Sequence, residues 1–233
     1  MARYYQQIIE DQVQRWSKQR TEADRIGERP GDWPVITVSR EFGAQGAALA
    51  AIVGQRLGFK VWDKELLQAI AEEGGGDEAL LRSLDEHRRR NIDDAVRGIL
   101  MGTRHTNMQY LRALLRVVKT IAFHGKSIIV GRGANYILAP EACLRVRVVC
   151  PLEQRVRGYA LRQQISEQEA RKIVEKMDIE RAEFIQKSFK RPLDIAADYD
   201  LILNTGTYTL DQLANLVMLA YETKVGRRVP VAG

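Results

Sequence analysis

Arginines and glycines lie where several predicted strands end, and these residue types can bind phosphate. The clearest case is VITVSREFGAQGAALAAIVGQRLG at 35–58, where an apolar strand leads through a glycine-containing turn into a helix. Backbone N–H groups at such a turn converge on an anion, and the positive end of the helix dipole adds to their field. The turn therefore predicts a phosphate-binding loop.

This loop lacks the lysine that phosphate-binding loops usually carry for the β- and γ-phosphates. A gap-free register places Gly46 at the lysine and an alanine at the Mg²⁺-binding hydroxyl. We expect Arg40 to supply part of the missing charge; alternatively, it pairs with Glu41 or Asp63 and only holds the loop. The predicted triphosphate-binding residues are Ser39, Arg40, Gly43, Ala44, Gln45, Gly46, Ala47 and Ala48.

Further candidates follow the other predicted strands. Arg132 lies just past the third strand, with Asn135 nearby, and a guanidinium group can bind phosphate oxygens bidentately. Asp63 follows the second strand, where a carboxylate can hold a sugar hydroxyl, a base amino group or a Mg²⁺-bound water. It can also cap the helix that begins DKELL. Arg155 and Arg162 are seven apart on one helical face after the fourth strand.

The sequence leaves the Mg²⁺ ligands open. Ser39 is the hydroxyl nearest the ligand edge and is the candidate ligand, while the three histidines form no metal pattern. Mg²⁺ keeps several waters in many proteins, so phosphates and waters can hold most of it.

The elements that position these residues alternate between strand and helix. The predicted strands lie at 35–39, 59–63, 143–151 and 199–205, with another that begins at Ser127. The alternation predicts a three-layer α/β fold, a parallel sheet with helices on both faces. Ligands bind at the carboxyl edge of such sheets. The charge-rich segment 77–105 reads as mobile surface helices, with HRRRN either a solvated face or a substrate-facing basic patch.

The chain divides into a helical extension and one α/β domain. The extension is 1–31, whose helix we expect to pack on the body or on a second copy, forming a homodimer. The domain is 32–233. Its predicted parts are the core (35–63, 126–151 and 199–222), a helical insert (64–125), and a further helical region (152–198) that begins with two helices split near Ser166.

Composition argues against several classes of function. The chain has 233 residues, 45% hydrophobic, 28% charged and a formal net charge of +6. Basic residues are mixed with acids, which does not favour a nucleic-acid surface. No apolar run reaches membrane-span length, and the N-terminus is too polar for a secretory signal. The two cysteines form no disulfide framework, so a cytoplasmic location is expected.

Six stretches in order resemble the cytidylate kinase-like family, a branch of the P-loop nucleoside monophosphate kinases. They are ITVSREFGAQG, VWDKELL, VGRGANYIL, RVRVVCPLEQRV, MDIERAEFI and YDLILNTGTYTLDQLANLV, and they span residues 35–220. A loop S-R-E-x-G-x-x-G commonly replaces the lysine-bearing loop in that branch. The resemblance implies a kinase core, a monophosphate-binding insert and an arginine-bearing lid. It also implies ATP and Mg²⁺ as cofactors and a nucleoside monophosphate as substrate.

The resemblance also implies roles for single residues. Arg132 matches the arginine of a G-R-D motif that contacts the monophosphate nucleoside, but Gly133 stands at its aspartate. Asp178 and Arg181 match a D-x-x-R in which the arginine closes on the transferred phosphate, and Arg155 matches an arginine of the lid-entry helix. The expected catalytic residues are Arg40, Arg155 and Arg181. The expected monophosphate-binding residues are Asp63, Arg132, Gly133 and Asn135.

The expected function is ATP-dependent phosphoryl transfer to a nucleoside monophosphate, with CMP or dCMP the first guess. Two alternatives stay open because the loop lysine and the aspartate are absent. One is a nucleotide-binding regulator without turnover, and the other is a kinase for a different small acceptor.

Overall fold

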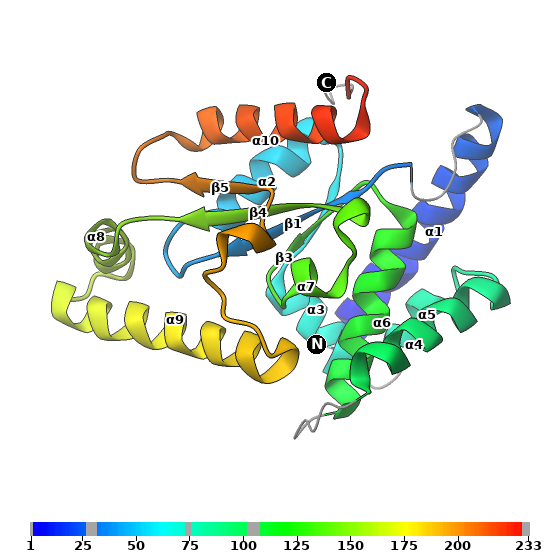
Figure 1. Cartoon of the computed structure of the whole chain (residues 1–233), viewed down its shortest axis with the longest axis horizontal. Coiled ribbons are helices and arrows are strands. Elements are labelled where there is room, and N and C mark those ends of the chain that lie inside the picture. Colours follow the sequence, from blue (N-terminus) through cyan, green and yellow to red (C-terminus); the bar gives the residue numbers. More distant parts are fainter. Residues whose placement is uncertain (1, 27–31, 73–75, 102–107, 230–233) are drawn as a thin grey trace.

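The computed structural model describes residues 2–26, 32–72, 76–101 and 108–229 of the chain (Figure 1). Within these residues one sheet of five parallel strands has the order β2-β3-β1-β4-β5. The strands are β1 (Val35–Arg40), β2 (Lys60–Trp62), β3 (Ser127–Val130), β4 (Cys143–Val149) and β5 (Leu201–Asn204). The predicted α/β fold with a parallel sheet is confirmed.

Helices separate the strands along the chain. The α-helices of the described residues are α1 (Ala2–Ile26), α2 (Gly46–Leu57), α3 (Lys64–Glu72), α4 (Gly76–Leu81), α5 (Glu86–Leu100), α6 (Met108–His124), α7 (Ala134–Ile137), α8 (Leu152–Gln163), α9 (Glu167–Phe189) and α10 (Leu210–Val225). Two short 3₁₀ helices are η1 (Pro140–Ala142) and η2 (Ala196–Asp198).

These helices cover both faces of the sheet. On one face α2 and α10 bury apolar side chains against the strands, among them Leu49, Val53 and Leu213. On the other face α3 and α6 do the same with Leu67 and Leu114. Figure 1 shows α2 and α10 above the sheet and α3, α6 and α9 below it. Crossover connections place helices on both faces, so the strands of a parallel sheet are buried apolar runs.

The carboxyl ends of the strands lie at one edge of the sheet because all the strand pairs are parallel. The loops after β1 and β3 therefore lie side by side there. Helix α9 adjoins the same edge, since Arg181 contacts the last residue of β1 and Asp178 contacts the loop that follows. Residues far apart in the sequence are thus brought together where ligands bind in such folds.

The helical region after β4 is split at Ser166, as predicted. The Glu169 N–H donates to the Ser166 Oγ at 3.2 Å, and the Ser166 N–H donates to the Glu169 carboxylate at 3.3 Å. This reciprocal capping box satisfies two N–H groups at the start of α9. Helix α8 ends just before it, where Gln164 adopts a left-handed conformation with φ 55°. The cap therefore fixes where α9 begins.

The charge-rich segment that we expected to form mobile surface helices contains α4 and α5. Leu80 and Val96 are buried in the same apolar cluster as α6, so both helices pack against the body. Within HRRRN, Arg88 and Arg90 are exposed, and neither lines the cavity described below. This stretch is a solvated helix face rather than part of that cavity.

Helix α1 packs on the body of its own chain. Ile9 is 4% exposed and Trp16 is 2% exposed, both in the cluster that also holds α3 and α6. The Trp16 indole stacks on the His124 ring, with centroids 4.0 Å apart, and on the Trp62 ring at 5.9 Å. We expected this helix to pack either on the body of its own chain or on a second copy, and in the structure it packs on the body.

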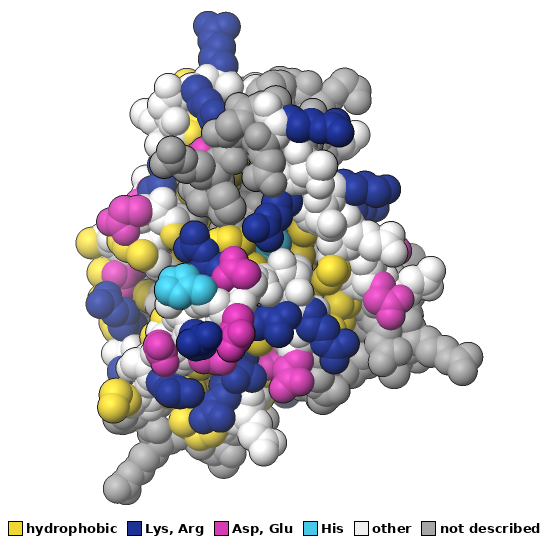
Figure 2. Space-filling model, turned by 90° about the vertical axis from the view of Figure 1, so that its right-hand side faces the viewer, with side chains coloured by type: hydrophobic (Ala, Val, Ile, Leu, Met, Phe, Trp, Pro, Cys, Tyr) yellow, Lys and Arg dark blue, Asp and Glu magenta, His cyan; other side chains and the backbone are white. Residues whose placement is uncertain are grey.

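Charges of both signs are interspersed on the face that Figure 2 shows, which is the right-hand side of Figure 1 where α1 and α5 lie. A nucleic-acid surface would need a contiguous basic face, and this face does not offer one. Among the helices of the described residues, none is long and apolar enough to cross a membrane.

Candidate active site at the carboxyl edge of the sheet

The loop after β1 has the shape of an anion cradle. Gly43 has φ 82° and Gln45, which precedes α2, has φ 58°, so both adopt the left-handed conformation. Gly46 has no room for a side chain, because a Cβ there would lie 2.7 Å from the Arg40 Cβ. Helix α2 then begins, and its first N–H groups, including those of Ala47 and Ala48, have no intrahelical acceptor. These groups and the helix dipole favour an anion.

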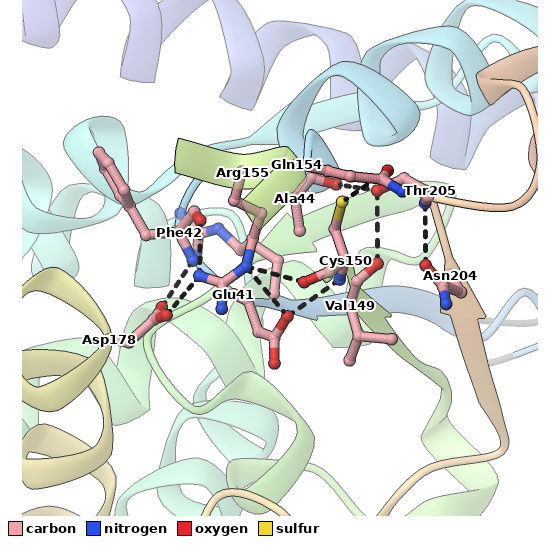
Figure 3. Close-up of polar contacts among 12 residues, drawn as sticks. Glu41, Phe42, Ala44, Val149, Cys150, Gln154, Arg155, Asp178, Asn204 and Thr205 are labelled. Carbon is pink, nitrogen blue, oxygen red and sulfur yellow. Dashed lines mark hydrogen bonds and ion pairs between the residues drawn. The ribbon is translucent and has the colours of Figure 1, made fainter. Parts of the chain in front are cut away.

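Arg155 of α8 and Asp178 of α9 pair with each other and hold this loop by hydrogen bonds (Figure 3). The Phe42 N–H donates to the Asp178 Oδ1 at 2.7 Å, and the Phe42 carbonyl accepts from the Arg155 Nη1 at 3.0 Å. Arg155 also forms an ion pair with the Asp178 Oδ2 at 2.5 Å and donates to the Cys150 carbonyl at 2.8 Å. Arg155 is therefore buried and fully engaged, and it does not line the cavity described next.

Four positive side chains line a cavity of about 150 Å³ beside the loop, and they come from four different elements. Arg40 ends β1, Lys64 begins α3, Arg132 follows β3 and Arg181 lies on α9. The Arg181 Nη1 donates to the Arg40 carbonyl at 3.0 Å, which ties α9 to the strand end. The structure thus brings together Arg40, Arg132 and Arg181, which the sequence predicted, and adds Lys64.

None of these four side chains forms an ion pair with a carboxylate among the described residues. Burial lowers the pKa of Arg40 to about 10, and the positive charge of Arg181 adds to this. Burial and then the charge of Arg132 lower the pKa of Lys64, and burial lowers the pKa of Arg181. Acids within electrostatic range, Glu65 for Arg40 and Lys64 and Asp178 for Arg181, offset only part of the cost of burying these cations. An anion in the cavity would remove this cost.

The two acids that could have paired with Arg40 are bound elsewhere. Glu41 accepts the Cys150 N–H at 2.9 Å and lies 3.5 Å from the Arg155 Nε. The Asp63 Oδ1 accepts the Leu66 N–H at 2.8 Å, so Asp63 caps α3, which is one of its predicted roles. The guanidinium of Arg40 therefore remains available to a ligand.

Arg132 lies in a strained turn and is held from several sides. Its φ of 53° stands between the positive φ values of Gly131 and Gly133. The Arg132 Nη2 is in close contact with the Gln68 side-chain oxygen. Among the described residues, the Arg132 Nε and the Asn135 Nδ2 are buried without a hydrogen-bond partner. Arg132 and Asn135 both contribute to the lining of the cavity.

Ser39, the predicted Mg²⁺ ligand candidate, accepts a hydrogen bond from the Arg147 Nη1 at 3.0 Å. A guanidinium at this distance opposes a metal ion through charge repulsion. Among the described residues there is no group of three or more His, Cys, Asp or Glu side chains that could hold a metal. The side chains of these residues do not fit a protein-held Mg²⁺.

Two cationic residues of this edge were missed from the sequence. Lys64 lies in DKELL, a stretch that reads as the capped start of a helix. Arg147 pairs in register with Ser39 across β4 and β1, is 7% exposed, and lies over the Tyr199 ring at 5.7 Å. A charged residue inside the otherwise apolar run VRVV was a signal for it.

A second cavity, of about 390 Å³, lies between Gln45 and the loop after β5, lined by residues 205–210. The Thr205 Oγ1 donates to the Ala44 carbonyl at 3.2 Å, which joins the two loops.

A parallel sheet with a glycine-containing turn after its central strand and cations at its carboxyl edge defines a P-loop-like α/β protein. Residues 35–207 match the model of the Cytidylate kinase-like family, and the chain belongs to this family.

Two solved structures match the chain over most of its length. The crystal structure of an uncharacterized protein from Eubacterium ventriosum ATCC 27560 shares 18% identity and a TM-score of 0.65, covering 82% of this chain and 98% of that chain. The crystal structure of TT1252 from Thermus thermophilus shares 17% identity and a TM-score of 0.44, covering 82% and 97%. No curated protein sequence matches the chain.

Proposed function

We propose that this protein transfers the γ-phosphoryl group of ATP to a phosphate oxygen of a small phosphorylated acceptor. Membership of the family supports nucleotide binding, and CMP and dCMP are the first acceptors to test. The observation that carries the proposal is the convergence of Arg40, Lys64, Arg132 and Arg181 on one cavity beside the phosphate loop.

Phosphoryl transfer needs alignment of two phosphates and stabilisation of charge more than covalent help. The turn at Gly43 and the start of α2 would hold the triphosphate, with Arg40 and Arg181 close to the transferred group. Arg132 would hold the acceptor phosphate. An acceptor oxygen then forms a bond to the γ-phosphorus as the bond to the β–γ bridging oxygen breaks, and ADP leaves. In this proposal Arg155 positions the loop and does not touch the substrate.

Mg²⁺ neutralises phosphate charge in kinases of this kind. Because Ser39 is bound to Arg147 and the described residues offer no ligand set, we assign no step to the metal. The two free cysteines, both buried, fit a reducing compartment such as the cytosol.

The test is an ADP-release assay on the full chain with ATP, Mg²⁺ and a panel of phosphorylated acceptors. We expect turnover that Arg181→Ala lowers at least tenfold. Arg157→Ala is the matched control and should match the wild type, because Arg157 is an exposed arginine whose Nε donates to the Glu153 carbonyl.

The alternative is a nucleotide-binding regulator, and the missing loop lysine favours it. ATP binding by calorimetry with no ADP release for any acceptor would support the regulator and contradict the proposed kinase.

A further inference from the structure

Two hydroxyl side chains of β1 lie beside two arginines of β4. The register pairs Thr37 with Arg145 and Ser39 with Arg147, and residues two apart point to the same face of a strand. Arg145 forms an ion pair with Asp200, whose Oδ1 lies 2.7 Å from the Arg145 Nη2. Arg147 is only 7% exposed, yet among the described residues it forms no ion pair with a carboxylate. The more deeply placed arginine thus lacks the counter-ion that the other one has.

The contacts of Arg147 are a hydroxyl and an aromatic ring. Its Nη1 donates to the Ser39 Oγ at 3.0 Å, and its guanidinium lies over the Tyr199 ring at 5.7 Å. Several acids line a neighbouring cavity together with Arg147, each beyond ion-pair distance from it: Glu41, Asp178, Glu183 and Asp194. Their attraction offsets part of the cost of burying this cation, but a charge without a direct partner remains costly. This favours a role for Arg147 beyond stability.

The hydrogen bond from Arg147 decides what the Ser39 hydroxyl can offer to a ligand. A guanidinium group only donates, so the Ser39 Oγ is the acceptor in this bond. A hydroxyl also carries one proton of its own, and among the described residues no other group forms a hydrogen bond with the Ser39 side chain. The Ser39 O–H is therefore available as a donor. Hydrogen bonds in a chain polarise one another, so the positive guanidinium makes the hydroxyl a stronger donor.

Ser39 lies where such a donor can meet an anion. It directly precedes Arg40 at the end of β1, and it lines the cavity that Arg40 and Arg181 also line. Arg147 does not line this cavity, so it would act on a ligand through the serine. The oxygens of a phosphate dianion accept hydrogen bonds and have no proton to donate, which matches a hydroxyl that can only donate.

We infer that Ser39 donates a hydrogen bond to a phosphate oxygen of the bound substrate, and that Arg147 is a positioning residue that holds the hydroxyl in this role. The inference rests on the proposed function and assigns roles in the same site to these two residues. Without Arg147, the serine could rotate and turn a lone pair instead of its proton toward the phosphate.

Calorimetric titration of the full chain with inorganic phosphate tests the role of Ser39. Ser39→Ala removes the donor and should weaken phosphate binding about tenfold or more. Ser39→Thr keeps the hydroxyl and should restore most of the affinity. Thr37→Val is the matched control and should bind phosphate as the wild type does. Thr37 lies on the same face of β1, but its Oγ1 donates to the Leu144 carbonyl at 3.5 Å and it does not line the cavity.

The positioning role of Arg147 is tested by removing it with and without the Ser39 hydroxyl. Arg147→Met should weaken phosphate binding about fivefold or more in the wild type but less than about twofold in Ser39→Ala, because residues that act as a unit are not additive. If Arg147→Met does not fold, Arg147→Leu replaces it. Urea unfolding measures the stability of each variant separately from its phosphate affinity.

Three binding outcomes would overturn the inference. They are a wild type that binds no phosphate, a Ser39→Ala variant that binds it as tightly as the wild type, and an equal loss from Arg147→Met in both backgrounds. ADP release separates this inference from the proposed function. The expected affinities without turnover of any acceptor would support the role of Ser39 and contradict the kinase. Turnover by the wild type, with unchanged phosphate affinity in Ser39→Ala, would support the kinase and contradict the role of Ser39.

Discussion

In the proposed function, the Arg40 guanidinium supplies charge that a lysine ammonium supplies in other phosphate-binding loops. It stands at the end of the central strand, before the turn, rather than at the start of the following helix. Its carbonyl accepts a hydrogen bond from Arg181, and its guanidinium lies against Gly131, in the loop after β3. In the proposed reaction, this guanidinium would lie between the donor and acceptor phosphates.

Arg40→Ala should weaken the binding of both ATP and inorganic phosphate. Hydrogen bonds to charged groups contribute about 1.5–3 kcal/mol, so we expect a loss of roughly 10- to 100-fold in affinity. Calorimetry measures both affinities, with Arg157→Ala as the control at an exposed position. Unchanged affinity for ATP and for phosphate would show that Arg40 only holds the loop.

Gly131→Ala tests the same group without removing its charge. A Cβ at this position would lie 1.9 Å from the Arg40 Nη1, and the φ of 83° also disfavours alanine. We expect the guanidinium to be pushed aside and phosphate affinity to fall about as far as in Arg40→Ala. Gly98→Ala is the control, because nothing lies within 4 Å of its Cβ. In the interior of α5 that change should stabilise the protein by up to about 1 kcal/mol. Phosphate binding that survives Gly131→Ala would contradict the placement of Arg40.

At the scale of elements, α9 is joined to the phosphate loop by polar contacts. Asp178 accepts from the Phe42 N–H, Arg155 bridges Asp178 and the Phe42 carbonyl, and Arg181 binds the Arg40 carbonyl. Asp178 and Arg181 are three residues apart and so share one face of α9. Movement of α9 would therefore move the loop, because the same side chains hold both.

Arg155→Met should destabilise the fold. It would leave Asp178 and Glu41 without their cation, and breaking a buried ion pair costs up to about 3–5 kcal/mol. The two acids are partly exposed, so we expect about 2–3 kcal/mol by urea unfolding, together with a raised KM for ATP. Arg155→Lys should restore part of the stability because it keeps the charge. A fall in kcat with unchanged stability and KM would instead make Arg155 a catalytic residue.

The contact between α1 and α6 should make stability depend on pH. Burial, and then the charge of Arg20, lower the pKa of His124 from 6.5 to about 4. The unfolded chain therefore binds more protons between these values, so stability rises with pH across this window and is lost as pH falls through it. At pH 5.5 the loss for this group is about 1.4 kcal/mol relative to pH 7.5.

Urea unfolding of the wild type and His124→Gln at both pH values measures this loss. Glutamine can keep a hydrogen bond to Ser83, whose Oγ lies 2.8 Å from the His124 Nε2, but it does not titrate. His87→Gln is the control because His87 is exposed. If His124→Gln loses as much stability as the wild type at pH 5.5, His124 is not the titrating group.

For the whole molecule, the sequence predicted the sheet well because buried parallel strands are apolar runs separated by helical periodicity. The capping box at Ser166 was equally visible, since it is local. The site was only partly predictable. Arg155 and Arg181 look alike in sequence, yet Arg155 forms an ion pair with Asp178 whereas Arg181 lines the cavity. That difference depends on how α8 and α9 meet the loop, which spacing along one chain does not encode.

The sequence likewise could not decide the partner of α1, because its apolar side chains could pack either on the body of the same chain or on a second copy. Trp16 is buried between His124 and Trp62, so the stripe is used within the chain. Replacing a buried aromatic residue by alanine costs about 3–5 kcal/mol, and we expect this loss in urea unfolding of Trp16→Ala. Arg15→Ala, one residue away on the exposed face, should change stability by less than about 0.5 kcal/mol.

Because the apolar stripe of α1 packs within its own chain, the unfolding midpoint of the wild type should not depend on protein concentration. A midpoint that rises with concentration and no longer does so in Trp16→Ala would show instead that α1 joins two copies.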